Sequence, residues 1–284
     1  MNNFLLLDLL SMYNSKKARG EKMIVKLQED SMEKVMKYVK KQPALNLFII
    51  GDLENFGFTH DFQELWGDLD EEGNLQGVLL RYRNSFIPYS EGEHDIAGFA
   101  KIIETFDGPL AFSGCEEVIE RYEPFIGHLM GRKTRTYFCQ CTKDSFVPCH
   151  DGKVEIQRAD LGMIDDVTDL LETIEEFSLR PDIRESNRHR IESGTGRTYF
   201  IAENGKPISS ASTTAENTNS AMVMAVCTAN EARGKGYASR IVSKLASDLL
   251  KEGRVPCLFY DNPVAGKIYK AIGFRDIGKW TMYR

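Results

Sequence analysis

A glycine-rich segment near the end of the chain, Arg233-Gly-Lys-Gly-Tyr-Ala238, has residue types and spacing suited to binding an anion. It follows an apolar run at 221–228 that is typical of a strand, and it opens a helical pattern that continues to Glu252. Glycines in such a turn allow several backbone N–H groups to point at one anion, and the start of a helix adds roughly half a positive charge. The segment is therefore predicted to bind phosphate.

Two familiar phosphate-binding motifs fit this segment poorly. A P-loop needs a glycine, four residues and then Gly-Lys-Ser/Thr, and the sequence has no such string. A dinucleotide-binding fingerprint, Gly-x-Gly-x-x-Gly, is matched by Gly234 and Gly236, but Ser239 stands at its third glycine. Asp261 has the position of a ribose-binding acid, yet the chain is too short after it for further βαβ units.

A second segment carries polar groups on one face of a predicted helix. After a strand-like run at 255–260, the chain reads Asn262-Pro-Val-Ala-Gly-Lys-Ile-Tyr269 and then Lys-Ala-Ile-Gly273-Phe274. Asn262 and Tyr269 are seven residues apart, close to two helical turns, so an amide and a phenol share one face. Pro263 suits the first turn of this helix, and Gly273 suits the position just after its end. Both polar groups are able to hydrogen-bond a cofactor, although a tyrosine in this setting is also typical of core packing.

Together the two segments resemble the GNAT superfamily of acyl-CoA N-acyltransferases. Arg233, Gly236 and Ala238 match its pyrophosphate-binding motif, Arg-x-x-Gly-x-Gly/Ala. The second segment matches its pattern Asn-x-x-Ala-x-x-x-Tyr-x-x-x-Gly-Phe. The resemblance implies a GNAT fold for residues 152–284, of α+β class with a mixed sheet, and acetyl-CoA or another acyl-CoA as co-substrate.

The resemblance also implies roles for individual residues. In the family, acyl-CoA inserts between two splayed central strands, which are 221–228 and 255–260 in this chain. Backbone groups of the first strand would polarise the thioester carbonyl. Asn262 would bond the pantetheine arm, and Tyr269 would protonate the departing thiolate, for which a neutral phenol is suited. The residues expected to bind the cofactor are Val226, Cys227, Thr228, Arg233, Gly234, Lys235, Gly236, Tyr237, Ala238, Ser239 and Asn262.

The sequence leaves the general base open. No carboxylate lies within 221–228, and the candidates, acting directly or through water, are Glu172, Glu175, Glu176, Glu216 and Asp261. Asp261 equally suits the cap of the helix that begins at Pro263. Cys227 has the chemistry of a nucleophile, but no histidine is near it in the sequence, so direct transfer from CoA to an amine is the simpler mechanism.

The acceptor is indicated only weakly. Arg180, Arg184 and Arg188 recur at four-residue intervals and would share one side of an expected helix. They suit a carboxylate-bearing acceptor, but a solvated basic stripe paired with Asp182 and Glu185 is the commoner outcome for such a pattern.

The composition of the whole chain is ordinary. Its 284 residues suggest two domains, and its net charge of −6 argues against general binding of nucleic acid. No apolar run approaches the ~18–20 residues needed to cross a bilayer. Residues 1–22 lack the basic start and the cleavage site of a signal peptide, so they are interpreted as an extension. These features predict a cytoplasmic protein with no membrane or nucleic-acid partner.

The six cysteines are expected to be reduced thiols. Cys139, Cys141, Cys149 and His150 form the cluster that hints at a metal, but a Cys-x-Cys pair followed by an eight-residue gap is not a usual zinc spacing. Cys139 and Cys141 fall on one face of a predicted strand, so they are expected to be buried small side chains, and no metal site is predicted.

The first half of the chain, residues 23–144, repeats the rhythm of the second half. Strand-like runs at 64–68 and 76–82 lie between helical patterns, and a last strand is predicted at 134–142. This half has neither the glycine turn nor the Asn…Tyr helix, so it resembles a degenerate GNAT copy that does not bind CoA. An unrelated α+β domain is the alternative. The segment 145–152 is the predicted linker.

The two motifs favour an acetyl-CoA-dependent N-acyltransferase that moves an acyl group directly to the amine of a small molecule. A non-catalytic acyl-CoA-binding sensor or scaffold is the alternative, because the base is not evident. The chain is expected to be either a monomer with two pseudo-repeated halves or a homodimer.

Overall fold

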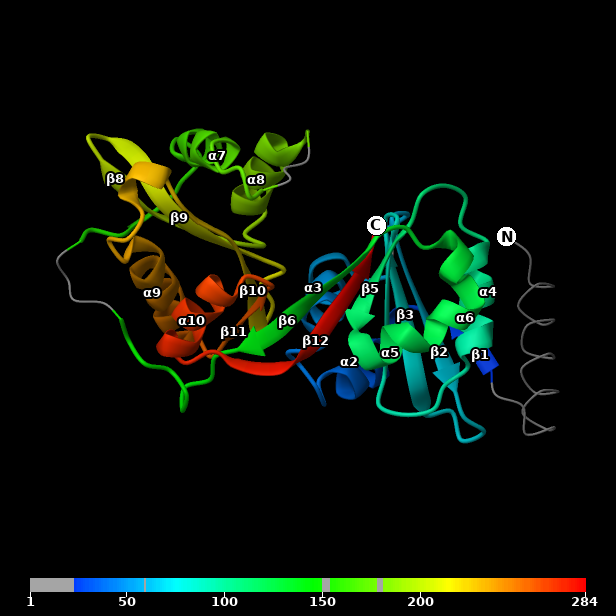
Figure 1. Cartoon of the computed structure of the whole chain (residues 1–284). Coiled ribbons are helices and arrows are strands. Elements are labelled where there is room, and N and C mark those ends of the chain that lie inside the picture. The colour runs from blue at the N-terminus through cyan, green and yellow to red at the C-terminus, as the bar shows by residue number, and fades with distance from the viewer. Residues whose placement is uncertain (1–22, 59, 150–153, 178–180) are drawn as a thin grey trace. The chain divides into compact units, whose positions relative to one another are not determined.

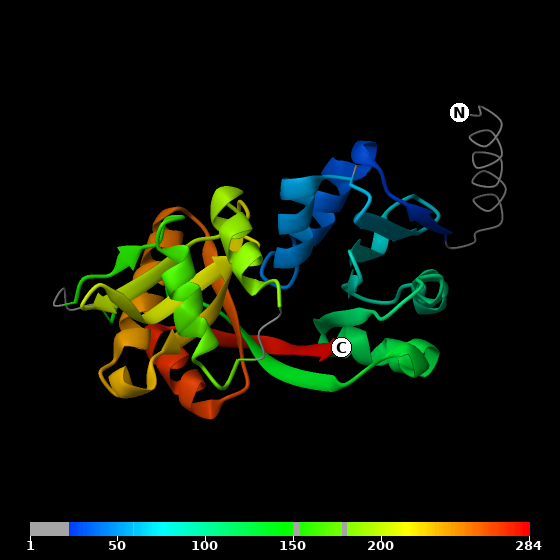
Figure 2. The same cartoon turned by 90° about the horizontal axis from the view of Figure 1, so that it is seen from above.

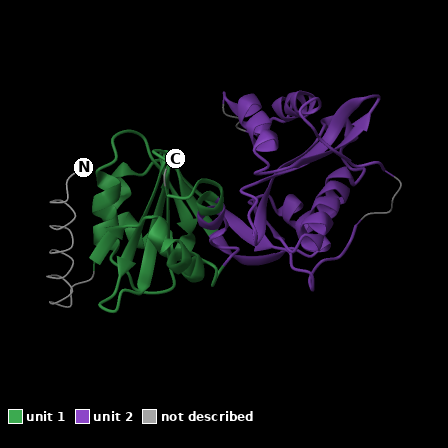
Figure 3. Cartoon of the chain, turned by 180° about the vertical axis from the view of Figure 1, so that it is seen from behind, with its two compact units in different colours: residues 1–42, 52–135, 280–284 green, residues 43–51, 136–279 purple. Residues whose placement is uncertain are grey.

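The computed structural model describes residues 23–58, 60–149, 154–177 and 181–284 (Figure 1). The chain divides into two compact units. Unit 1 consists of residues 1–42, 52–135 and 280–284, and unit 2 consists of residues 43–51 and 136–279 (Figure 3). Both units combine helices with a mixed sheet, which confirms the expected α+β class. The expected extension at 1–22 lies outside the described residues. No helix in the described ranges is long and apolar enough to cross a membrane.

Unit 2 has the element order that the sequence predicts for the second half of the chain. Its elements are β7 (Gln157–Arg158), α7 (Ile164–Glu172), α8 (Ile183–Glu192), β8 (Thr198–Glu203), β9 (Lys206–Thr214), β10 (Ser220–Thr228), η4 (Asn230–Ala232), α9 (Tyr237–Lys251), β11 (Val255–Tyr260), α10 (Pro263–Ile272) and the start of β12 (Arg275–Tyr283). The buried residues of α9, which include Ile241, Leu245 and Leu249, recur at helical spacing. They form the core stripe that the sequence predicts.

The sheet of unit 2 has the strand order β6-β11-β10-β9-β8-β7, where β6 spans Lys133–Gln140 and enters the unit at residue 136. β10 and β11 are parallel, and the other neighbours are antiparallel. Helices α9 and α10 cover one face of this sheet, and α7 and α8 cover the other (Figure 1). Figure 2 shows α7 and α8, in shades of green, in front of the yellow strands β8 and β9. The two parallel strands therefore lie inside the unit, covered on both faces.

The two parallel strands part along their length. Their pairing ends at Val223↔Leu258. Beyond that point the register of β10 with β9 shifts between Met224 and Cys227, and Ala225 has a φ of 50°, which marks a β-bulge. β10 and β11 therefore splay, in agreement with the geometry that the family resemblance implies.

Unit 1 repeats this topology. Its elements are β1 (Met23–Lys26), η1 (Glu29–Ser31), α2 (Met32–Val39), the end of α3 (Leu47–Phe56), β2 (Gln63–Leu69), β3 (Leu75–Tyr82), β4 (Ser85–Ser90), α4 (Ile96–Glu104), β5 (Ala111–Cys115), α5 (Glu116–Ile119), η2 (Glu120–Tyr122), α6 (Glu123–Ile126), η3 (Gly127–Leu129) and the end of β12. The strand order is β1-β2-β3-β4-β5-β12, and β4 pairs with β5 in parallel, as β10 does with β11. Unit 1 is therefore a second copy of the same fold.

Each unit completes its sheet with a strand from the other half of the chain. β6, at the end of the first half, pairs through residues 137–140 with β11. β12, at the end of the second half, pairs through residues 280–283 with β5. The units therefore have other bounds than the domains expected at 23–144 and 152–284. The reason is that the sequence pattern of a strand indicates which side is buried but does not identify the strand beside it.

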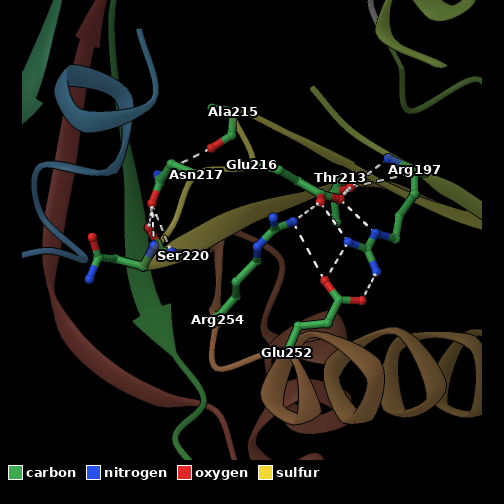
Figure 4. A network of polar contacts seen from close by, with 9 residues as sticks. Arg197, Thr213, Ala215, Glu216, Asn217, Ser220, Glu252 and Arg254 are labelled. Carbon is green, nitrogen blue, oxygen red and sulfur yellow. Dashed lines mark hydrogen bonds and ion pairs between the residues drawn. The ribbon is translucent and has the colours of Figure 1, made fainter. Parts of the chain in front are cut away.

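A buried ion network fixes the loop between β9 and β10 (Figure 4). The Glu216 carboxylate accepts hydrogen bonds from the Arg197 guanidinium at 2.8 and 2.7 Å and from Arg254 at 2.6 Å. Glu252, just after α9, accepts two more from Arg197 at 2.5 and 2.8 Å. Glu216 and Arg197 are both buried. The hydrogen bonds within the network must therefore replace those that each charged group would form with water.

Substitution Glu216→Ala is expected to destabilise the protein strongly, because it removes the buried carboxylate between Arg197 and Arg254 and leaves them only the half-exposed Glu252. We expect the free energy of unfolding, measured by urea denaturation, to fall by roughly 3–5 kcal/mol. Asp165→Ala removes an exposed ion pair with Arg188 and is the control, with an expected loss below about 1 kcal/mol. Equal losses for the two variants would contradict the structural role of the network.

Candidate active site

A cleft opens in unit 2 where β10 and β11 part. Its volume is about 670 Å³, and its walls are the end of β10, the start of α9, the end of β11, the first turns of α10 and the segment after α7. The predicted site residues that line it are Val226, Cys227, Thr228, Arg233, Gly234, Gly236, Tyr237, Ala238, Ser239, Asn262 and Tyr269. The structure therefore brings the two sequence motifs together around one cavity.

Lys235 is the predicted cofactor-binding residue that does not line this cleft. It lines a neighbouring cleft of about 910 Å³, and its Nζ lies 3.6 Å from the Glu203 carboxylate. The Tyr237 hydroxyl donates to the same carboxylate at 3.0 Å, and the Lys235 ammonium lies over the Tyr237 ring. The Lys235 charge is therefore held on the far side of the turn.

The glycine turn owes its composition to backbone conformation rather than to lack of space. Gly234 and Gly236 have φ values of 82° and 77°, in the left-handed region that favours glycine. A Cβ atom at either position would meet nothing within 4 Å. Gly236 is the N-cap of α9, so the first turn of this helix, whose N–H groups have no intrahelical partner, lines the cleft. These N–H groups and the helix dipole favour an anion there.

Arg233 joins two walls of the cleft. Its Nη1 and Nη2 donate to the Glu176 carboxylate at 2.9 and 3.2 Å, and its Nε donates to the Thr228 carbonyl oxygen at 3.2 Å. The hydrogen bond from Arg233 lowers the pKa of Glu176 below its usual value. Arg233 thus links the end of β10 to the segment after α7, and its charge is largely balanced by a carboxylate.

Tyr269 presents a neutral phenol to the cleft. It is 8% exposed, and burial raises its pKa to about 12, so it stays protonated at neutral pH. Its ring packs against Tyr260 and Phe274, with ring centroids 6.0 and 6.1 Å away. No described residue hydrogen-bonds to its hydroxyl group. The O–H group is therefore available to a ligand in the cleft.

Asn262 is the N-cap of α10. Its Oδ1 accepts a hydrogen bond from the backbone N–H of Val264 at 2.8 Å. The interpretation of Asp261 as the cap of this helix was therefore wrong, because Asn262 holds the capping position directly before Pro263. The Asn262 amide nitrogen has no acceptor among the described residues, so it remains able to donate to a ligand.

Two of the five candidate bases line the cleft, Glu176 and Asp261. Glu216 belongs to the buried ion network, and Glu172 is ion-paired on the surface of α7 and α8. Glu175 does not line the cleft. Glu176 is bound by Arg233, whereas Asp261 is exposed.

Two arginines of α8 form ion pairs with helix α7. Arg184 and Arg188 form ion pairs with Asp165, Asp169 and Glu172. The sequence suggested neighbours within the same helix as partners, but α7 and α8 pack together and α7 supplies these carboxylates. Arg180 lies outside the described residues. Neither Arg184 nor Arg188 lines the cleft.

Cys227 lines the cleft as a buried thiol. Burial raises its pKa above the usual value, which disfavours the nucleophilic thiolate. Its sulfur lies 3.3 Å from the Ser210 hydroxyl, and no histidine that the structure describes lines the cleft. The described residues contain no group of three or more His, Cys, Asp or Glu side chains that could hold a metal, and His150 lies outside them.

The corresponding turn of unit 1, between β4 and α4, is acidic. It carries Glu91, Glu93 and Asp95. Asp95 is the N-cap of α4, and its carboxylate accepts from the Gly98 N–H group at 2.8 Å. A carboxylate thus occupies the helix start at which the other copy leaves room for phosphate. We therefore expect unit 1 to bind no CoA.

Comparison with known proteins places these features in a family. A family model described as GNAT acetyltransferase matches residues 140–283. A GCN5-related N-acetyltransferase-like protein from Streptococcus suis is 18% identical, with a TM-score of 0.56, over 90% of this chain and 98% of that chain. A GCN5-related N-acetyltransferase from Sphaerobacter thermophilus is 12% identical, with a TM-score of 0.59, over 92% and 94% of the two chains. No curated protein matches the sequence.

A further solved structure resembles both halves of the chain. It is a tandem GNAT protein from the clavulanic acid biosynthesis pathway, 14% identical, with a TM-score of 0.59, and it covers 93% of this chain and 98% of that chain. At such identities the likeness concerns the fold alone. The family match spans slightly more than half of the chain and contains the glycine turn, Asn262 and Tyr269. The chain therefore belongs to the GNAT acetyltransferase family.

Proposed function

We propose that the chain is an N-acyltransferase that moves an acetyl group from acetyl-CoA directly to the amine of a small molecule. The observation that carries this proposal is one cleft that is lined both by a glycine turn at a helix start and by a buried neutral phenol. The first suits the charged end of CoA, and the second suits its leaving thiolate. Membership of the family supports acyl transfer from acyl-CoA, and the choice of acetyl and of an amine goes beyond it.

The donor is proposed to lie along β10, in place of the strand that has parted from it. Its pyrophosphate binds the turn at 233–239, to which Lys235 contributes its backbone rather than its ammonium. Its pantetheine arm pairs with the backbone at Val226–Thr228 and with the Asn262 amide. At the bulge, Ala225 and Val226 have no Cα partner on β9 or β11. Their backbone N–H groups are therefore proposed to bind the thioester carbonyl.

The chemical step requires one proton to leave the amine and one to reach the sulfur. As the amine nitrogen bonds to the thioester carbon, the C–S bond breaks and the thiolate takes the proton of the Tyr269 hydroxyl. Asp261, directly or through water, is proposed to take the proton of the amine. Glu176 is less suited because its hydrogen bond with Arg233 stabilises the ionised form.

Tyr269→Phe tests the proposed acid. We expect kcat for transfer to fall about 100-fold or more, because the thiolate must leave unprotonated, while the Kd for CoA measured by calorimetry stays nearly unchanged. Tyr237→Phe is the matched control, since it removes another cleft phenol whose hydroxyl contacts Glu203. Unchanged transfer in Tyr269→Phe would remove this residue from the chemistry. CoA binding without any transfer in the parent protein would favour the sensor or scaffold alternative.

Asp261→Asn tests the proposed base. We expect it to lower kcat/KM for the amine about tenfold or more while leaving the Kd for acetyl-CoA unchanged, because the amide cannot accept the proton. Glu176→Gln is the comparison, and a smaller effect is expected from it. A larger loss of kcat/KM in Glu176→Gln than in Asp261→Asn would identify Glu176 as the base in place of Asp261.

Gly236→Glu tests the phosphate turn. The substitution sets a carboxylate and a strained backbone against the pyrophosphate, so CoA affinity is expected to fall at least ~10-fold, or ~1.4 kcal/mol, in a calorimetric titration. Gly253→Glu is the matched control, because Gly253 follows the other end of α9 with a similar φ of 81° and equally open space. Equal affinities for the two folded variants would refute the assignment of the turn.

A further inference from the structure

Phe259 stands at the inner end of the cleft. It is the first residue of β11 beyond the last pair with β10, Val223↔Leu258, and it lines the cleft. Leu258 and Tyr260 belong to the core beneath α9 and α10, so strand alternation places Phe259 on the opposite face of the sheet. Its ring is therefore found where the two strands begin to separate.

Two further phenylalanines pack against this ring. Phe138 of β6, which is fully buried, lies opposite Phe259 in the antiparallel ladder, with ring centroids 4.8 Å apart. Phe48, in the first turn of α3, has its centroid 6.3 Å from that of Phe259. Aromatic pairs at such distances gain energy beyond simple burial. The three rings form an aromatic cluster, Phe48–Phe138–Phe259, behind the cleft wall.

Phe48 comes from the first half of the chain and is held by the loop after β9. Asn217 Nδ2 donates to the Leu47 carbonyl oxygen at 3.0 Å. A Cβ atom at Gly51 would lie 3.2 Å from the Ala215 carbonyl oxygen, so α3 approaches this loop closely. Glu216, between the two contact residues, is fixed by the ion network (Figure 4). The cluster therefore has firm support on the side away from the cleft.

We propose that Phe259, backed by Phe48 and Phe138, limits the donor to a short acyl group such as acetyl or propionyl. The inference rests on the proposed function, because it takes the cleft as the acyl-CoA site. The phosphate turn and Asn262 follow the open ends of β10 and β11, so the thioester end of the donor points toward the closed end. An acyl chain that extends past the thioester meets the Phe259 ring there.

The test compares the Kd values of acetyl-CoA and butyryl-CoA, measured by calorimetry on the full chain without an acceptor. The parent protein is expected to bind acetyl-CoA at least about tenfold more tightly than butyryl-CoA. A close-fitting apolar wall discriminates at this level between acyl groups that differ by one or two methylenes. Phe259→Ala is expected to bring the two Kd values together or reverse their order. Phe48→Ala is expected to change the ratio in the same direction by a smaller factor, and Phe48→Leu replaces it if the alanine variant does not fold.

Phe106→Ala is the control, because Phe106 packs against Phe86 in unit 1 and lines no part of the cleft. It is expected to leave the ratio of Kd values unchanged. Equal Kd values for the two acyl-CoA molecules in the parent protein would overturn the proposal, as would an unchanged ratio in folded Phe259→Ala. An unchanged ratio in the folded Phe48 variant would show that Phe48 does not contribute to the selectivity. Selective binding without transfer to any amine would count against the proposed function alone. Absence of binding by both acyl-CoA molecules would overturn both.

Discussion

The parting of β10 and β11 is the constraint on which the rest of unit 2 depends. Beyond Val223 and Leu258 the two strands no longer pair with each other, and backbone groups inside a covered sheet require a hydrogen-bonding partner. The bulge at Ala225 accompanies the separation, and α9 and α10 follow the separated strand ends. An extended molecule that carries amide groups is suited to fill the gap as an added strand does. The glycine turn then lies where the charged end of such a molecule would emerge.

The two halves show how one topology supports different roles. Both have parallel central strands followed by a helix, but the helix start in unit 2 has glycines with positive φ and the one in unit 1 has a capping carboxylate. This difference in charge and backbone shape favours a phosphate at the start of α9 and disfavours one at the start of α4. The first half also contributes the start of α3 and most of β6 to unit 2. The duplication thus supplies supporting structure to unit 2.

Features that depend only on residues close together in the sequence were predictable from it. The glycine turn, the polar face of α10 and the apolar stripe of α9 are local patterns, and the structure contains all three. Strand β4 was missed because Pro88 interrupts its pattern, although it pairs on both sides. Glu216 was interpreted as a possible base because its burial with Arg197 leaves no sequence signal. The exchange of β6 and β12 and the position of Phe48 were missed for the same reason, since each depends on residues distant in the chain.

The exchange of strands has a consequence for biosynthesis. The sheet of unit 1 is completed by residues that are translated only after all of unit 2, because β12 pairs with β5 through Trp280–Tyr283. Until they emerge, β5 keeps an open edge of the kind that pairs with other chains. A nascent chain of this architecture cannot finish its N-terminal half first, as ordinary tandem domains do. Loss of Trp280–Tyr283 would therefore damage the half of the protein that was translated earliest.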